Sequence, residues 1–282
     1  MSASRESGNS ISIFLILTFG LAFLTWGIMA VFQLPGASTD PQAPPPSVVH
    51  LVLFILGGFS PSIAGILTAL LSGGRKALKD LFRRSVRFSF GLKYYLFIAL
   101  VPVVIFAFRL GLHALRGGEF LDSALLAQPV SFVGFTIQIL FLGPLSEEFG
   151  WRGVALDSML YKLKTVRSSL ILGAVWAVWH LPLFFIPGTA QNKFGNPVAE
   201  FVIFAAGVVG MTVVFTWLYI GTNRSLASAV LYHFTYNFAI SLLATLMDGG
   251  IVDRIVNSGV QVAIALVIIV IGGSRSAKSA VM

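Results

Sequence analysis

Cysteine is absent from the 282-residue sequence. Its absence excludes disulfide bonds, a thiolate nucleophile, and zinc or iron–sulfur sites built on cysteine ligands. Charged residues are also scarce, at 11% of the chain, whereas soluble domains carry about 25%. So few charges cannot cover a water-facing surface, and the sequence therefore indicates a protein embedded in lipid.

Long apolar runs dominate what is present. Hydrophobic residues make up 56% of the chain, and the mean hydropathy is +0.89. Because about 20 apolar residues cross a bilayer as a helix, we predict an all-α polytopic transmembrane helix bundle of about eight spans, forming a single integral membrane domain over residues 1–282. The predicted spans are 11–33, 48–72, 94–113, 130–146, 168–187, 198–220, 225–247 and 256–273. The proline-rich stretch after the first span, residues 34–47, is predicted to be a solvated loop.

The positive charge is unevenly distributed along the chain. Residues 73–93 hold seven Lys and Arg residues against one acidic residue, Asp80. By the positive-inside rule this stretch should face the cytoplasm. Eight spans then place 15 of the 19 basic residues, and both termini, on the cytoplasmic side of the cell membrane. The net charge of +8 therefore indicates orientation in membrane lipid and not binding of nucleic acid. The same stretch could be a simple charged loop or a basic amphipathic segment lying on anionic lipid.

The first polar cluster is SEEFGWRG, residues 146–153, predicted at the cytoplasmic end of span four. Neighbouring residues of a helix point about 100° apart, so Glu147 and Glu148 cannot both face the same target. Glu148 is four residues before Arg152 and can pair with it. Glu147 is left to face another group, and an unpaired, desolvated carboxylate can act as a base. The alternative is a charged helix end at the membrane interface.

The second polar cluster is WAVWHLPLFF, residues 176–185, inside span five. Trp176 is one turn before His180 on the same helix face. Pro182 has no backbone N–H to donate and should kink the helix. A kinked helix with a histidine at membrane depth suggests a water-filled cavity. The alternative is a histidine bonded to a neighbouring helix.

The third polar cluster is YHFTYN, residues 232–237, in span seven. His233 and Asn237 are four residues apart and project from one face of a helix. Two strong hydrogen-bonding groups one turn apart could hold an oxyanion or a substrate carbonyl. The alternative is hydrogen bonding that joins membrane helices.

In order and spacing, the three clusters resemble the CPBP family of CAAX-processing and bacteriocin-associated membrane peptidases, also called the ABI or Rce1-like family. That family is marked by EExxxR, then an aromatic residue four positions before a histidine, then HxxxN. This sequence reads Glu147-Glu148-x-x-x-Arg152, then Trp176-x-x-x-His180, then His233-x-x-x-Asn237. The resemblance covers about residues 130–245 and implies an intramembrane endopeptidase that acts on a membrane-associated peptide or protein, of which prenylated CAAX proteins are one class.

The resemblance also implies a role for each motif residue. Glu147 and His180 would activate the attacking water, while His233 and Asn237 would bind the tetrahedral oxyanion. Three residues would support the site: Glu148, Arg152 and Trp176. We favour catalysis without a metal cofactor. Zinc is the alternative, since Glu147, His180 and His233 would make a set of two histidines and one carboxylate that zinc could accept.

Two other functions remain as alternatives. Intramembrane Glu, His and Asn residues also form ion or proton paths in transporters. Transporters commonly show inverted repeats and paired broken helices, and neither is evident in this sequence. A non-catalytic membrane protein of the bacteriocin-immunity type is the second alternative. The peptidase hypothesis predicts that spans four, five and seven meet, so that the catalytic residues line one polar cavity open to the cytoplasm.

Overall fold

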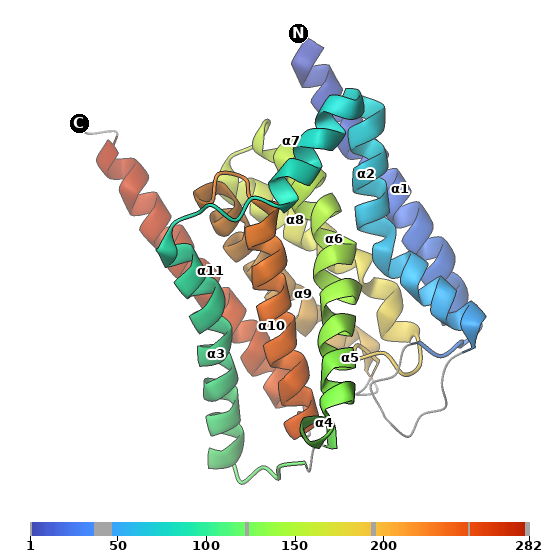
Figure 1. The fold of residues 1–282 in the computed structure, drawn as a ribbon. Coiled ribbons are helices and arrows are strands. Elements are labelled where there is room, and N and C mark those ends of the chain that lie inside the picture. The colour runs from blue at the N-terminus through green and yellow to red at the C-terminus, as the bar shows by residue number, and fades with distance from the viewer. Residues whose placement is uncertain (1, 37–46, 122–123, 193–195, 248, 280–282) are drawn as a thin grey trace.

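The computed structural model describes residues 2–36, 47–121, 124–192, 196–247 and 249–279. Over these residues the chain is a bundle of helices without a named strand (Figure 1). Most of the proline-rich stretch, residues 37–46, lies outside the described residues. The main helices are α1 (Ser2–Val31), α2 (Val48–Ser85), α3 (Leu92–Leu115), α5 (Pro129–Leu140), α6 (Ser146–Gly150), α8 (Thr165–Trp179), α9 (Pro197–Gly221), α10 (Leu226–Leu246) and α11 (Ile251–Ser279). Shorter helical pieces are α4 (Ala124–Ala127), η1 (Phe141–Leu145), η2 (Trp151–Leu156), α7 (Asp157–Leu160) and η3 (Leu181–Phe185).

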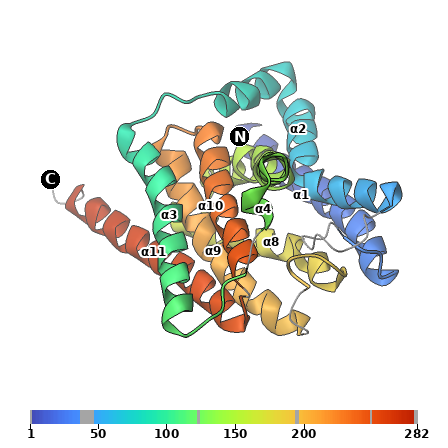
Figure 2. The same cartoon turned by 60° about the horizontal axis from the view of Figure 1, so that its bottom comes forward.

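Eight stretches of the described chain are helical, long and apolar enough to cross a membrane, as predicted. They are Ser10–Val31, Val48–Ser85, Leu92–Leu115, Pro129–Leu160, Thr165–Phe185, Pro197–Gly221, Leu226–Leu246 and Ile251–Ile271. The protein is therefore an all-α, multi-pass bundle. Figure 2 shows span four nearly end-on, between α10 on one side and α2 on the other.

Span two is longer than predicted. The apolar run ends near residue 72, but α2 continues to Ser85 after a break at Gly74, whose φ of 60° suits a residue without a Cβ. The first half of the basic stretch 73–93 is therefore a helical arm and not a loop. Leu81 and Arg84 of this arm are buried, and Arg84 donates hydrogen bonds to the Gly153 carbonyl and to Asp157. The arm is thus packed onto the bundle.

Span four is also longer than predicted. It was expected to end at residue 146, but the helix runs on through α6, η2 and α7 to Leu160. At 1.5 Å per residue, Leu160 is about 20 Å beyond Glu147 along the helix. The prediction that Glu147 lies at the end of its span is therefore wrong. The apolar run stops at the two glutamates, but the helix continues because both carboxylates have partners inside the bundle.

Close helix crossings hold this span in the bundle. Helices α2 and α6 cross at Gly65 and Gly150, where a Cβ added to Gly150 would lie 2.2 Å from the Pro61 carbonyl oxygen. Small residues allow helix backbones to approach in this way in membranes. Around the crossing, Trp26, Trp151 and Trp179 form the buried aromatic core.

Candidate active site

Glu148 is fixed by two partners in the interior of the bundle. Its side chain is fully buried, and its Oε1 accepts hydrogen bonds from Arg152 Nη1 at 2.9 Å and from His233 Nδ1 at 2.7 Å. The guanidinium carbon of Arg152 also lies 4.2 Å from the ring centre of Trp176 and 3.8 Å from that of Phe215. The predicted pairing of Glu148 with Arg152 is confirmed. Glu148 also joins span four to span seven.

Glu147 has a different partner. Its Oε2 accepts a hydrogen bond of 2.7 Å from the indole Nε1 of Trp176, on α8. The two adjacent glutamates therefore bind different groups, as the helix geometry predicts. These groups nevertheless belong to one cluster, because the rings of Trp176 and His233 pack edge to face with their centres 5.7 Å apart.

His180 lies where span five leaves the α-helix. Helix α8 ends at Trp179, and Pro182 is near the start of the 3₁₀ turn η3. Pro182 thus follows the end of the α-helix, and span five departs from α-helical geometry next to the predicted position. The His180 Nδ1 is 2.8 Å from the Trp176 carbonyl oxygen. Because a carbonyl only accepts, Nδ1 carries a proton, and in the neutral ring Nε2 has the free lone pair.

His233 and Asn237 project from α10 toward the π-helical turn η1. A Cβ placed on Gly143 of that turn would lie 2.8 Å from Asn237 Nδ2 and 3.7 Å from His233 Nε2. His233 is buried, whereas Asn237 is only partly buried. The two donors predicted from the HxxxN spacing therefore approach the same point beside span four.

Trp176 lies at the centre of this arrangement. Its indole N–H binds Glu147, its carbonyl binds the His180 ring, and its ring packs 5.7 Å from the ring centres of both His180 and His233. Spans four, five and seven therefore meet around one tryptophan. The sequence motifs did not reveal Phe215 and Phe204, which come from α9 and pack against His233 and His180. Both are apolar residues inside a predicted span, so the sequence alone does not distinguish them from the other apolar residues of that span.

The zinc alternative was tested against the positions of the ligands. Among the described residues, no three His, Asp or Glu side chains are placed so that they could hold a metal ion together. Glu147 and His180 are each bonded to Trp176, and His233 is bonded to Glu148 through Nδ1. As placed, these three residues form no ready three-ligand cluster, although bonds through Nδ1 do not themselves exclude a ligand at Nε2.

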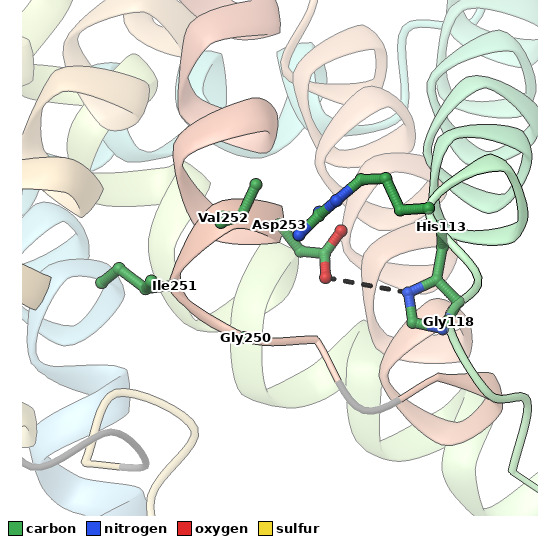
Figure 3. A pocket seen from close by; sticks show the side chains of 7 residues that line it. His113, Gly118, Gly250, Ile251, Val252 and Asp253 are labelled. Carbon is green, nitrogen blue, oxygen red and sulfur yellow. Dashed lines mark ion pairs between the residues drawn. The ribbon is translucent and has the colours of Figure 1, made fainter.

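A second polar site lies away from this cluster. A cavity of about 230 Å³ lies between the end of α3 and the start of α11, with His113, Arg116, Gly118 and residues 250–253 as its lining (Figure 3). The His113 Nδ1 and Asp253 Oδ2 face each other at 3.9 Å. The lining includes no residue of the three sequence motifs, so this cavity is separate from the candidate active site.

Comparison with known proteins agrees with the geometry. A family model described as type II CAAX prenyl endopeptidase Rce1-like matches residues 129–239, a range that contains all three motifs. Over these residues the chain is similar to the Rce1-like (CPBP) family. The CAAX prenyl protease 2 of Methanococcus maripaludis is 24% identical over 262 residues, which cover 91% of this chain and 92% of that protein. Both comparisons therefore point to CAAX-type endopeptidases, and the eight apolar helices among the described residues make the chain a multi-pass membrane protein.

Proposed function

We propose that this Rce1-like protein hydrolyses a peptide bond of a membrane-associated substrate, with Glu147 and His180 activating water and with His233 and Asn237 binding the oxyanion. The observation that carries the proposal is the position of Trp176, which binds Glu147 and His180 and packs against His233. Side chains from three spans are thereby brought together at membrane depth, where isolated ionisable groups are costly.

The two adjacent glutamates differ in what they can do. A carboxylate has two oxygens and about four acceptor positions, and Glu147 uses Oε2 to bind Trp176. Its other oxygen can accept a hydrogen bond from water. Glu148 instead holds Arg152 and His233 together and is fully buried. This difference supports Glu147 as the base and Glu148 as a support.

The proposed reaction moves one proton twice. Glu147 takes a proton from water, whose oxygen attacks the substrate carbonyl carbon, while His180 Nε2 accepts a hydrogen bond that orients the same water. The carbonyl oxygen becomes an oxyanion and accepts hydrogen bonds from the Asn237 amide and from His233 Nε2. In this arrangement His233 Nδ1 donates to the Glu148 carboxylate, and Nε2 donates to the oxyanion. The C–N bond breaks as the leaving nitrogen receives the proton held by Glu147.

The surroundings of His180 suit an apolar substrate. The ring centres of Trp179 and Phe204 lie 4.5 Å and 4.9 Å from that of His180, and Phe184 packs against Phe204 at 5.5 Å. The relative from Methanococcus is named a CAAX prenyl protease, and a CAAX protein carries its prenyl group on the cysteine of that motif. We therefore propose a prenylated CAAX-type chain as the substrate class.

An internally quenched peptide ending in a farnesylated CAAX sequence tests the function. The purified protein should cleave it, and mass spectrometry should find a new peptide end within the CAAX sequence. Glu147→Gln keeps the shape of the side chain but removes the base, so kcat should fall by about 100-fold or more. Undiminished cleavage by this variant would contradict the proposal. The same peptide without the farnesyl group should be cleaved less efficiently if the lipid is recognised.

Metal dependence is tested separately. Because Glu147 and His180 activate water without a metal in the proposed mechanism, we expect activity to survive a strong chelator, and elemental analysis to find no stoichiometric zinc in the active protein. Loss of cleavage in chelator, with recovery on adding zinc, would instead support the zinc alternative.

A further inference from the structure

The π-helical turn η1 brings a glycine next to the two proposed oxyanion donors. Leu142 departs from helical geometry, at φ −92° and ψ 19°, and Pro144 has no N–H to continue the usual bonding pattern. The Gly143 carbonyl accepts a hydrogen bond of 3.0 Å from the Ser146 hydroxyl. Such turns widen an α-helix and are frequent at functional sites. Here the turn directs buried Gly143 toward α10.

The space beside Gly143 is filled by side-chain atoms of the two proposed oxyanion donors. A Cβ at this position would lie 2.8 Å from Asn237 Nδ2, 3.7 Å from His233 Nε2 and 4.0 Å from Asn237 Cγ. The first distance is well inside the separation of about 3.5 Å at which non-bonded heavy atoms attract. Any side chain at position 143 would therefore have to displace the Asn237 amide.

Gly143 differs in this respect from the packing glycines of the same span. A Cβ on Gly150 would meet the Pro61 backbone and the ring of Phe14, so that glycine lets two helices approach. The nearest neighbours of Gly143 are instead side-chain atoms of the two HxxxN residues. The contact is therefore with the proposed site itself.

We infer that Gly143 is a positioning residue that fixes the Asn237 amide beside His233, where both can donate to the oxyanion. The inference rests on the proposed function. An oxyanion donor works only at hydrogen-bonding distance from the position the oxyanion will occupy, and a misplacement of about 1 Å can cost about 100-fold in rate. A methyl group at position 143 would cause a displacement of that kind.

The test is a double-mutant cycle on cleavage of the farnesylated CAAX peptide. Gly143→Ala should lower kcat by about 10- to 100-fold with little change in KM. In the Asn237→Ala background, where the clashing amide is gone, adding Gly143→Ala should lower kcat no further. The matched control is Gly134→Ala in α5 of the same span, where a Cβ would meet nothing within 4 Å, and its activity should equal the wild type. Normal activity of Gly143→Ala, or an equal loss in both backgrounds, would overturn the inference.

If Gly143→Ala folds poorly, the unfolding temperatures of the single and double variants in detergent provide a second test. Recovery of stability in the Gly143→Ala/Asn237→Ala double variant would place the clash at Asn237, as inferred. A double variant no more stable than Gly143→Ala would overturn the inference. The proposed function fails on different results: no cleavage by the wild type, or full cleavage by Asn237→Ala alone.

Discussion

At the scale of single residues, the two adjacent glutamates are held by unequal interactions. Glu147 receives one hydrogen bond, from a neutral indole, whereas Glu148 is bonded to a buried guanidinium and to an imidazole. Removing one member of a buried ion pair leaves the other charge without compensation, which costs about 3–5 kcal/mol. Losing a neutral hydrogen bond costs about 1 kcal/mol.

Glutamine substitutions at the two positions should therefore separate stability from activity. Glu148→Gln should destabilise the protein by about 3–5 kcal/mol, because Arg152 and His233 lose their shared negative charge. Glu147→Gln should change stability by about 1 kcal/mol or less. Chemical denaturation in detergent measures both variants against the wild type. Equal destabilisation by the two substitutions would show that Glu148 is not the structural member of the pair.

The same residues show what sequence spacing can predict. The Glu148–Arg152 pair was predictable because residues four apart on a helix are neighbours. The contact of Glu147 with Trp176, and the stacking of Phe215 on Arg152, join separate helices. Spacing within one helix does not say which faces of different helices meet. The motif resemblance grouped residues that the structure also places near one another, but it did not predict the central position of Trp176 among them.

At the scale of elements, span four shows why the predicted end of a span can be wrong. The apolar run predicted that the span ends at residue 146, because two glutamates follow. The helix nevertheless continues to Leu160, with π-helical turns before and after the glutamates. Polar residues mark the end of a membrane-spanning helix only if their side chains face lipid or water. Here Ser146, Glu147, Glu148 and Arg152 are all buried against neighbouring helices.

The crossing of α2 and α6 gives an element-scale prediction. A Cβ on Gly150 would overlap the backbone of Pro61, which cannot move aside as a side-chain tip can. Gly150→Ala should therefore force the two helices apart and destabilise the protein by about 1–3 kcal/mol or more. Gly134→Ala, in open space on the same span, should leave the unfolding temperature unchanged. Thermal unfolding of both in detergent makes the comparison, and a normal unfolding temperature for Gly150→Ala would contradict the crossing.

At the scale of the whole molecule, one end of the bundle carries the basic arm together with the first and last helical turns of the described chain. The basic arm of α2 lies at the same end as the start of α1 and the last turns of α11 (Figure 1). By the positive-inside rule this end should face the cytoplasm. Leu160 ends span four on this side, about 20 Å beyond Glu147 at 1.5 Å per residue. A substrate peptide arriving from the cytoplasm would thus have to reach well into the bundle.

Single cysteines test this orientation directly, because the natural chain has none. Lys76, on the basic arm, and Glu119, in the connection after α3, are both exposed. We expect Lys76→Cys to react with a membrane-impermeant maleimide only when the cytoplasmic face is opened, and Glu119→Cys to react in intact cells. The physical reason is that moving the four basic residues Arg75, Lys76, Lys79 and Arg83 across the bilayer is unfavourable. Labelling of Lys76→Cys in intact cells would reverse the orientation and place entry to the Glu147 site on the outer side.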